Sequence, residues 1–386
     1  MSKIPKPLAG LLCCGLALLA LPARALEYQV HGFAAQGFVL SEGNNLFGSS
    51  RDGSFDLYEL GLNGTVAFTP ALIGSAQVLY RDAGATDDDG LRLDYALLDW
   101  QFLTRTDGSA GIRLGRVKNP VGLYNETRDV VFTRPGILLP QSVYFDGAGI
   151  RGLLFSSDGG QLYGRRSLGE HELSATLGYA PGRELRDEER RVLGGGIPGD
   201  LELKDFHFFR LQDEWGGWLA SLSYLQAGVT VEQGGNRLGE FDFDFWIGSL
   251  RYSAERYSVT AEYLYLRSDG NSVFTGPFRN SGDGGYIQLD YRLTPRWTPY
   301  ARLDATYSDR NDRDGSRYEA LTGGHRHDRF AYDGTLGVRW LPDEHWGFWA
   351  EGHLIEGGAT ISGLDNAGRD TDDHWSALLL TAAYRF

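Results

Sequence analysis

Basic and acidic side chains gather in one stretch of this chain, where they could select solutes by charge. The six residues are Arg113, Lys118, Glu126, Arg128, Asp129 and Arg134. Charged groups around a narrow passage with low-dielectric walls magnify one another's field, so they sort small ions and polar solutes. The alternative is structural: the same charges could hold the segment in place through salt bridges to its neighbours.

The segment from 117 to 146 that carries most of these charges differs from the other polar stretches. It contains three prolines, Pro120, Pro135 and Pro140, which restrict the backbone. It also contains apolar residues that need a surface to pack against, namely Leu123, Val131, Phe132 and Leu139. We therefore expect a loop folded against another part of the molecule, in contrast to the acidic, glycine-rich stretches elsewhere.

Catalytic and metal-binding patterns are weak. There is no Gly-x-Ser-x-Gly nucleophile elbow. His325 and His327 lie near Asp328 and could hold a metal ion, but an ordinary polar loop is the better explanation. The aspartate-rich stretches lack the spacing of a calcium loop. We expect no catalytic residue, no metal and no cofactor.

The elements that must position the charged segment show a two-residue repeat along nearly the whole chain. Ala96, Leu98, Trp100 and Phe102 share one face of a strand, and polar residues occupy the other. The same alternation recurs at 58–68, 76–80, 259–265, 301–307, 332–340 and 376–386, where the last residue is Phe386. Alternation alone fits either a soluble β-sandwich or a membrane barrel.

Turn lengths separate these two folds. Tight turns are predicted at 69–70, 107–108, 169–170, 216–217, 254–255, 294–295 and 342–343. Long polar loops are predicted between them, at 41–54, 82–90, 181–204, 227–240, 268–283, 308–328 and 357–373. Short turns on one side, long loops on the other and aromatic residues beside the tight turns are typical of an outer-membrane barrel.

The predicted fold class is therefore all-β: a transmembrane antiparallel β-barrel of about 16 strands with an inward-folded constriction loop at 117–146. This count treats 147–167 as one long strand. A barrel of about this size encloses an aqueous channel, whereas one of about 8 strands is filled by its side chains.

Residues 1–25 have the features of a secretory signal peptide. Lys3 and Lys6 precede an apolar run, and Ala23-Arg24-Ala25 is a cleavage site, so the barrel domain is 26–386. Both cysteines lie inside the signal, which excludes disulfides and thiolate chemistry from the exported chain. The signal holds three of the 37 basic residues and none of the 51 acidic ones, so the remainder carries a net charge of −17. This charge argues against nucleic-acid binding.

The run from Gly115 to Tyr144, with the signal, the aromatic girdles and Phe386, resembles a Gram-negative outer-membrane porin of the sixteen-stranded, phosphate-selective-porin-like group. The resemblance implies a homotrimer of passive channels for ions and small hydrophilic solutes, surrounded by outer-membrane lipid and lipopolysaccharide. It places the constriction at Arg113, Lys118, Glu126, Arg128, Asp129 and Arg134. The alternative function is a barrel enzyme, or a receptor barrel with ligand-binding external loops.

The pore wall is predicted from the polar faces of the strands. We assign to it Arg151, Arg210, Arg302, Arg339, Glu262 and Glu351. Neither sign dominates among the inward charges, so an anion preference, which the resemblance would suggest, does not follow from the residues themselves. Opposed basic and acidic clusters would create a transverse field that favours small polar solutes.

Overall fold

The computed structural model describes residues 26–85, 87, 90–144, 156–185, 189–190, 199–273 and 276–386. The predicted signal peptide at 1–25, the last two residues of the predicted constriction loop and Arg151 lie outside the described residues. Among the described residues, no helix is both long enough and apolar enough to cross a bilayer.

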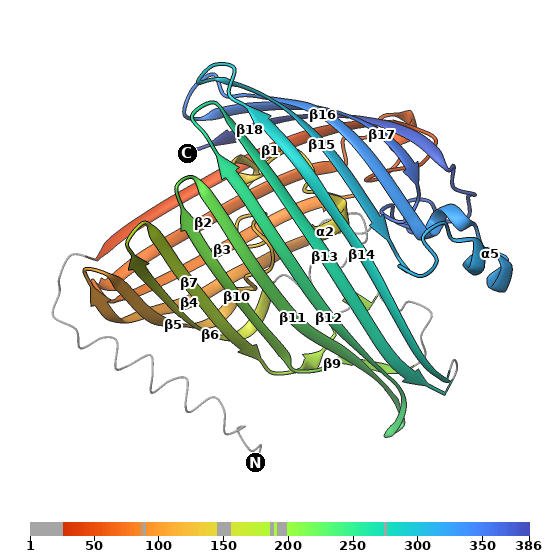
Figure 1. The fold of residues 1–386 in the computed structure, drawn as a ribbon, viewed down its shortest axis with the longest axis horizontal. Coiled ribbons are helices and arrows are strands. Elements are labelled where there is room, and N and C mark those ends of the chain that lie inside the picture. Colours follow the sequence, from red (N-terminus) through yellow and green to blue (C-terminus); the bar gives the residue numbers. More distant parts are fainter. Residues whose placement is uncertain are drawn as a thin grey trace, which may run out of the picture.

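Sixteen long strands form a closed antiparallel barrel, which confirms the predicted fold class (Figure 1). The strands are β1 (Glu27–Glu42), β2 (Leu57–Thr69), β3 (Leu72–Ala83), β4 (Gly90–Arg105), β5 (Gly108–Lys118), β6 (Ser156–Leu168), β7 (His171–Ala180), β10 (Phe206–Trp215), β11 (Trp218–Gln233), β12 (Asn236–Ser253), β13 (Tyr257–Ser272), β14 (Gly276–Tyr291), β15 (Trp297–Tyr307), β16 (Phe330–Trp340), β17 (Trp346–Gly357) and β18 (His374–Arg385). Each pairs with its neighbour, and β18 returns to pair with β1, so the long strands leave no open edge.

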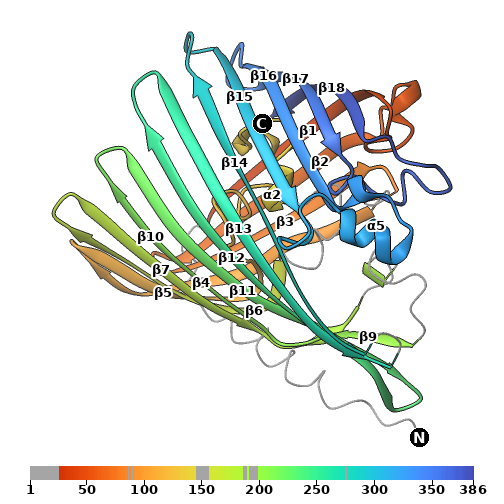
Figure 2. The same cartoon turned by 45° about the vertical axis from the view of Figure 1, so that its right-hand side comes forward.

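The remaining elements are short and lie in the connections. Two small strands, β8 (Arg183–Glu184) and β9 (Asp200–Leu203), pair with each other, and β9 also pairs with β11. The helical pieces are η2 (Ser50–Asp52), η3 (Val131–Thr133), α2 (Gln141–Tyr144), α5 (Ser316–Thr322) and η5 (Arg326–Arg329). Of these, η3 and α2 lie inside the barrel (Figure 2).

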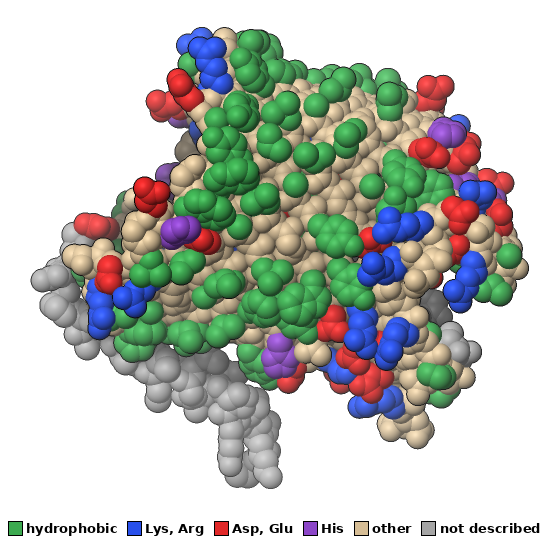
Figure 3. Space-filling model, viewed as in Figure 1, with side chains coloured by type: hydrophobic (Ala, Val, Ile, Leu, Met, Phe, Trp, Pro, Cys, Tyr) green, Lys and Arg blue, Asp and Glu red, His purple; other side chains and the backbone are tan. Residues whose placement is uncertain are grey.

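The two faces of the wall have opposite character. Outward residues such as Leu303 and Leu354 are 68% and 75% exposed. Inward residues such as Glu262 and Gln288 are 3% and 1% exposed. Figure 3 shows an apolar outer surface with charged side chains gathered toward its two ends. An apolar exterior around a polar interior is the arrangement that a hydrocarbon environment requires.

All seven predicted tight turns join consecutive strands at one end of the barrel. Four of the seven predicted long loops are also seen. The loop at 181–204 holds β8 and β9 and lies partly outside the described residues, and two predictions were wrong. Residues 227–240 and 268–283 belong mostly to the β11–β12 and β13–β14 hairpins, whose strands have 16 to 18 residues. A membrane span needs only about 9–11 residues. These strands therefore extend past it. In 268–283 polar residues on both faces obscure the two-residue repeat, whereas in β11 Ala227, Val229 and Val231 keep the repeat and are buried.

Candidate functional site

A glycine near the end of β5 lets this strand pack closely against β4, just before the chain turns into the barrel. Gly115 has a φ of +127°, and a Cβ atom there would lie 2.3 Å from the carbonyl oxygen of Ala96. Only glycine fits this close approach comfortably. The chain leaves β5 at Lys118 and runs across the interior through η3 and α2 (Figures 1 and 2). We call the described residues 119–144 the inner loop.

The inner loop is tied to the opposite wall by Glu262 of β13. Its Oε1 accepts hydrogen bonds from the Leu123 backbone N–H at 2.9 Å and from the Ser249 hydroxyl at 2.7 Å. Its Oε2 accepts from the hydroxyls of Tyr144 and Tyr286, both at 2.7 Å. Four donors satisfy one buried carboxylate, as a buried charge requires. Glu262 is therefore an anchor for both ends of the inner loop.

Glu351 of β17 anchors the middle of the inner loop in the same way. It accepts hydrogen bonds from the backbone N–H groups of Ile137 and Leu138, at 2.9 and 3.2 Å. The Tyr300 hydroxyl donates to it at 2.7 Å, and His353 Nε2 lies 3.3 Å away. The side chain of Glu351 is 1% exposed. The inner loop therefore covers the Glu351 side chain.

A second pair of wall residues, both on β15, also binds the inner loop. Arg302 donates to the Leu138 carbonyl at 3.0 Å, and Asp304 accepts from the Ser142 backbone N–H at 3.2 Å. Neighbouring inward positions of β13, β15 and β17 thus hold the backbone of one loop. Apart from the hydroxyl of Tyr144, the loop groups in these contacts belong to the backbone, so they fix the path of the loop with little dependence on its side chains.

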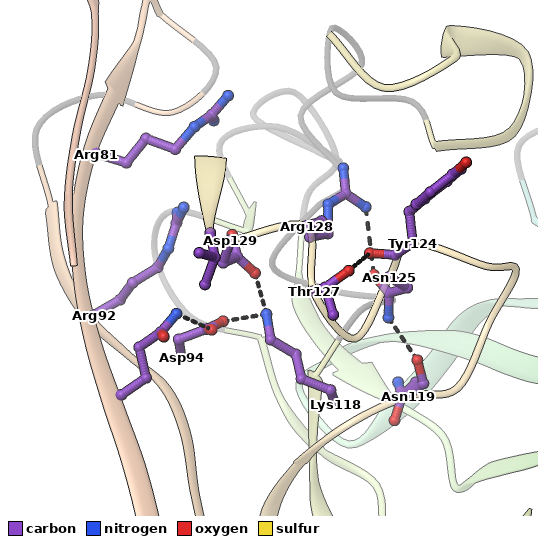
Figure 4. Close-up of polar contacts among 12 residues, drawn as sticks. Arg81, Arg92, Asp94, Lys118, Asn119, Tyr124, Asn125, Thr127, Arg128 and Asp129 are labelled. Carbon is purple, nitrogen blue, oxygen red and sulfur yellow. Dashed lines mark hydrogen bonds and ion pairs between the residues drawn. The ribbon is translucent and has the colours of Figure 1, made fainter. Parts of the chain in front are cut away.

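Where the inner loop lies beside β4, buried ion pairs hold it in place. Lys118 contacts both Asp94 of β4 and Asp129 of the loop, and all three side chains are buried (Figure 4). Arg128, 1% exposed, donates to the Tyr144 carbonyl at 3.2 Å and to Asn125 Oδ1 at 3.5 Å. These two basic residues face loop and wall atoms, which is the structural role that the sequence left open.

Arg134 belongs to a further buried cluster on β2 and β3. Its guanidinium group lies 2.7 and 2.8 Å from the two oxygens of Glu59. Glu59 also accepts from Arg81 at 2.8 Å, and Arg81 in turn contacts Asp87. Positive and negative groups thus alternate along this chain of contacts. The bidentate pair between Arg134 and Glu59 fixes the inner loop against the wall.

Apolar packing completes the attachment of the loop. Val131 and Leu139 are 3% and 1% exposed, and the ring of Phe132 meets Trp349 edge-on at a centroid distance of 5.4 Å. The predicted need for a packing surface is confirmed for these residues. The interior of the barrel supplies apolar wall residues such as Leu79 and Leu225 beside the loop.

Three charged side chains of this region, those of Arg113, Glu126 and Arg210, are partly exposed. Arg113 is 32% exposed, lies 3.0 Å from Asp99 and stacks over the Tyr163 ring at 4.6 Å. Glu126 of the inner loop lies 2.5 Å from Arg210 and 3.8 Å from Arg113. This small cluster, Arg113–Glu126–Arg210, brings the loop to the wall of β5 and β10. We refer to it as the eyelet cluster.

The described wall residues that the sequence placed inward, Arg210, Arg302, Arg339, Glu262 and Glu351, do lie on the inner face. The inward charges that the two-residue repeat did not reveal include Asp94 and Arg251, together with Arg81, which lies directly across the sheet from Glu59. Asp94, the partner of Lys118, follows a register shift between β3 and β4, which the simple alternation does not reveal. Arg251 of β12 pairs across the sheet with the buried Thr260, so it shares the inner face.

The possible metal site at 325–328 gains no support. His325 and His327 stack their rings 5.2 Å apart beside acidic residues. No group of three or more His, Cys, Asp or Glu residues among the described residues is arranged to hold a metal ion.

No protein-family profile and no curated protein matches the chain. Solved structures do. The outer membrane channel DcaP of Acinetobacter baumannii is 12% identical, with 95% of this chain and 99% of that one covered and a TM-score of 0.59. The anion-selective porin of Comamonas acidovorans is 13% identical, with 94% and 100% covered and a TM-score of 0.57. OmpT, an outer membrane protein of Vibrio cholerae in its trimer form, is 11% identical, with 94% and 100% covered and a TM-score of 0.57.

These likenesses define the class of the fold. A closed barrel of sixteen antiparallel strands with an apolar exterior has the architecture of the outer-membrane barrels. Across nearly its whole described length, the chain has the fold of the Gram-negative outer-membrane porins.

Proposed function

We propose that this protein is a passive porin that lets ions and small hydrophilic solutes diffuse across the bacterial outer membrane. The observation that carries the proposal is the inner loop, which crosses the interior of a sixteen-stranded barrel and is fastened to opposite walls. A loop held in this way narrows the interior without filling it as a separate plug domain would. Residues 1–25 would be the export signal, cleaved after Ala25.

The eyelet cluster is the best candidate for the charged constriction. Arg113, Glu126 and Arg210 are partly exposed to the interior, whereas Lys118, Arg128, Asp129 and Arg134 are buried among loop and wall atoms. In this proposal the exposed three act on passing solutes, and the buried four keep the loop in position. A basic and an acidic group facing each other create the transverse field expected to favour small polar solutes.

A homotrimer is part of the proposal. Its support is that OmpT, which shares the fold, is described in a trimer form. Outer-membrane lipid and lipopolysaccharide would then contact the exposed apolar wall outside the subunit interfaces.

The test is single-channel recording of the refolded protein in a planar bilayer, with a salt gradient across the membrane. We expect stepwise conductance, in groups of three if the trimer forms, and a reversal potential that reports the ion preference. A correctly folded barrel, identified by its heat-dependent electrophoretic mobility, that gives no conductance would contradict the proposal.

A further inference from the structure

A large hollow lies on the outer face of the barrel wall, across β12 to β18. Its volume is about 1120 Å³, and the exposed side chains of Leu250, Ile287, Leu303 and Leu354 border it. Figure 3 shows this wall, where backbone is visible between the apolar side chains. Pockets of about 300–1,000 Å³ hold drug-sized ligands, so the hollow has room for a ligand with several chains. We call it the wall hollow.

Small residues form the floor of the wall hollow. They are Gly248, Ala261, Gly285, Ala305 and Gly334, one from each of the strands β12 to β16. A Cβ atom added at Gly248 would meet nothing within 4 Å, and one added at Gly334 would meet only the Leu354 carbonyl oxygen, at 3.9 Å. In hydrocarbon, association depends on close van der Waals packing, and small residues let a partner approach the backbone. The floor therefore suits an apolar chain laid against the sheet.

Two tyrosines frame the centre of this floor. Tyr263, Gly285, Ala305 and Tyr332 lie directly across from one another on four successive strands, β13 to β16. Directly paired residues of an antiparallel sheet point to the same side, so two tyrosine rings flank two small residues on the outer face. We call this row of four residues the tyrosine slot.

The hydroxyls of the tyrosine slot point to polar partners. The Tyr263 hydroxyl donates to Asp283 Oδ2 at 2.8 Å, and the Tyr332 hydroxyl lies 3.1 Å from that of Tyr307. Tyrosine is favoured at membrane interfaces because its ring is apolar and its tip is polar. The slot thus joins the apolar wall to a polar rim.

Basic side chains lie at this rim, in the long loop that follows β15. Arg313 lies 2.6 Å from Asp283 and over the Tyr307 ring at 4.3 Å. The exposed Arg310 lies over the Tyr265 ring at 5.4 Å. Among the described residues, no carboxylate lies within 4.0 Å of the Arg310 guanidinium group. Two guanidinium groups therefore share one carboxylate beside the tyrosine slot.

We propose that the wall hollow, the tyrosine slot and these two arginines bind one molecule of lipid A, the phosphorylated and multiply acylated anchor of lipopolysaccharide. The inference rests on the outer-membrane placement within the proposed function, because the long loops of such barrels face the outside, where lipopolysaccharide forms the leaflet. Arg310 and Arg313 bind a phosphate through paired N–H donors. The acyl chains pass between Tyr263 and Tyr332 over the small residues of the floor.

The site has a consequence for the assembly. A lipid bound across β12 to β17 occupies this part of the wall, so the subunits of a trimer meet through the remaining strands.

The test counts lipids bound to the full-length refolded protein in detergent by native mass spectrometry. The probes are lipid A and phosphatidylglycerol, which also carries a phosphate but has two acyl chains. We expect saturable binding of one lipid A molecule per chain, with phosphatidylglycerol at least about tenfold weaker. Equal binding of the two lipids would overturn the assignment to lipid A.

One pair of variants tests the acyl chains. Gly248→Leu/Gly334→Leu fills the floor and should weaken lipid A binding about tenfold or more, because chain methylenes lose their place against the wall. Gly352→Leu is the matched control. Gly352 is an exposed outward glycine of β17 with nothing within 4 Å of an added Cβ atom, and it does not line the wall hollow.

A second pair of variants tests the phosphate contact, and it remains available if the double glycine variant does not fold. Arg310→Gln should weaken lipid A binding about fivefold or more, because it removes a charged donor. Its control is Arg296→Gln, since Arg296 is an exposed arginine in the turn between β14 and β15, at the opposite end of the same wall.

The outcomes separate the two proposals. Lipid A binding by a folded barrel that gives no conductance would overturn the porin function and leave the lipid site standing. Conductance without saturable lipid A binding would overturn the lipid site alone. The lipid site would also be overturned if Gly352→Leu or Arg296→Gln weakened binding as much as the variant that it controls.

Discussion

Tyr144 and Glu262 are joined by a hydrogen bond of 2.7 Å between the tyrosine hydroxyl and Oε2 of the carboxylate, although 118 residues separate them in the chain. The bond links the end of the inner loop to β13. The same carboxylate accepts from the backbone at Leu123, at the beginning of the loop. Glu262 therefore joins the beginning and the end of the inner loop. Glu351 binds the middle of the loop through two adjacent backbone N–H groups.

Removing both anchors should release the loop. In Glu262→Gln/Glu351→Gln, several buried donors lose a charged acceptor, at a cost of about 1–3 kcal/mol for each unsatisfied group. We expect a larger single-channel conductance with more frequent fluctuations. Glu172→Gln is the control, because Glu172 is an exposed carboxylate on β7 that does not touch the loop. A folded double variant with unchanged conductance would show that the loop does not limit the current.

The Arg81–Glu59–Arg134 cluster predicts an asymmetry in stability. Glu59→Gln removes the carboxylate from two guanidinium groups and should cost about 3–5 kcal/mol, the range for breaking a buried ion pair. Arg134→Gln leaves Glu59 with Arg81 and should cost less. The measurement is the temperature at which each barrel loses its compact electrophoretic mobility. Equal losses in the two variants would contradict this account of the cluster.

The barrel itself could be predicted from the sequence because its repeat is local. Each tight turn lies between two strands whose alternation is visible. The aromatic residues beside the turns indicated a membrane interface at that end of the strands. The hairpins at 227–240 and 268–283 were missed for different reasons. Residues 268–283 carry polar side chains and glycines on both faces, so no apolar face reveals the strand. In 227–240 the repeat of Ala227, Val229 and Val231 is visible, but the neighbouring polar and glycine residues favoured a loop.

The candidate site was predicted only in part. The segment 117–146 stood out through its prolines and apolar residues, and Val131 and Leu139 are indeed packed. The division of its charges into exposed and buried ones did not follow from sequence. Lys118 is buried because Asp94 lies across the sheet, and a register shift between β3 and β4 decides that. Such partners come from distant strands and leave no local pattern.

The eyelet cluster predicts how single charges change ion preference. Glu126→Gln removes the carboxylate that pairs with Arg210 and leaves Arg113 with Asp99 alone, so the anion-to-cation permeability ratio should rise by roughly twofold or more. Arg113→Gln should shift the ratio the other way. Reversal potentials in a salt gradient measure both effects.

Lys118→Gln serves as the contrasting variant for this series. Lys118 is buried between Asp94 and Asp129, so its loss should lower thermal stability more than it changes the reversal potential. If Lys118→Gln moved the reversal potential as far as Arg113→Gln does, the division into exposed and anchoring charges would be wrong.

The last prediction concerns the closure of the barrel at Phe386. Its backbone exchanges two hydrogen bonds with Gly32 of β1, at 3.0 and 3.2 Å. Its ring covers Gly32, where an added Cβ would lie 2.5 Å from a ring carbon. Gly32→Ala should therefore displace the ring and destabilise the barrel by about 1 kcal/mol, the low end of the range for overpacking, because the exposed ring can move. Gly352→Ala is the matched control on the same outer wall, since a Cβ there meets nothing within 4 Å and should change stability by about 0.5 kcal/mol or less. Thermal unfolding in detergent measures the difference. Equal effects of the two alanines would mean that the contact between Phe386 and Gly32 does not help to close the barrel.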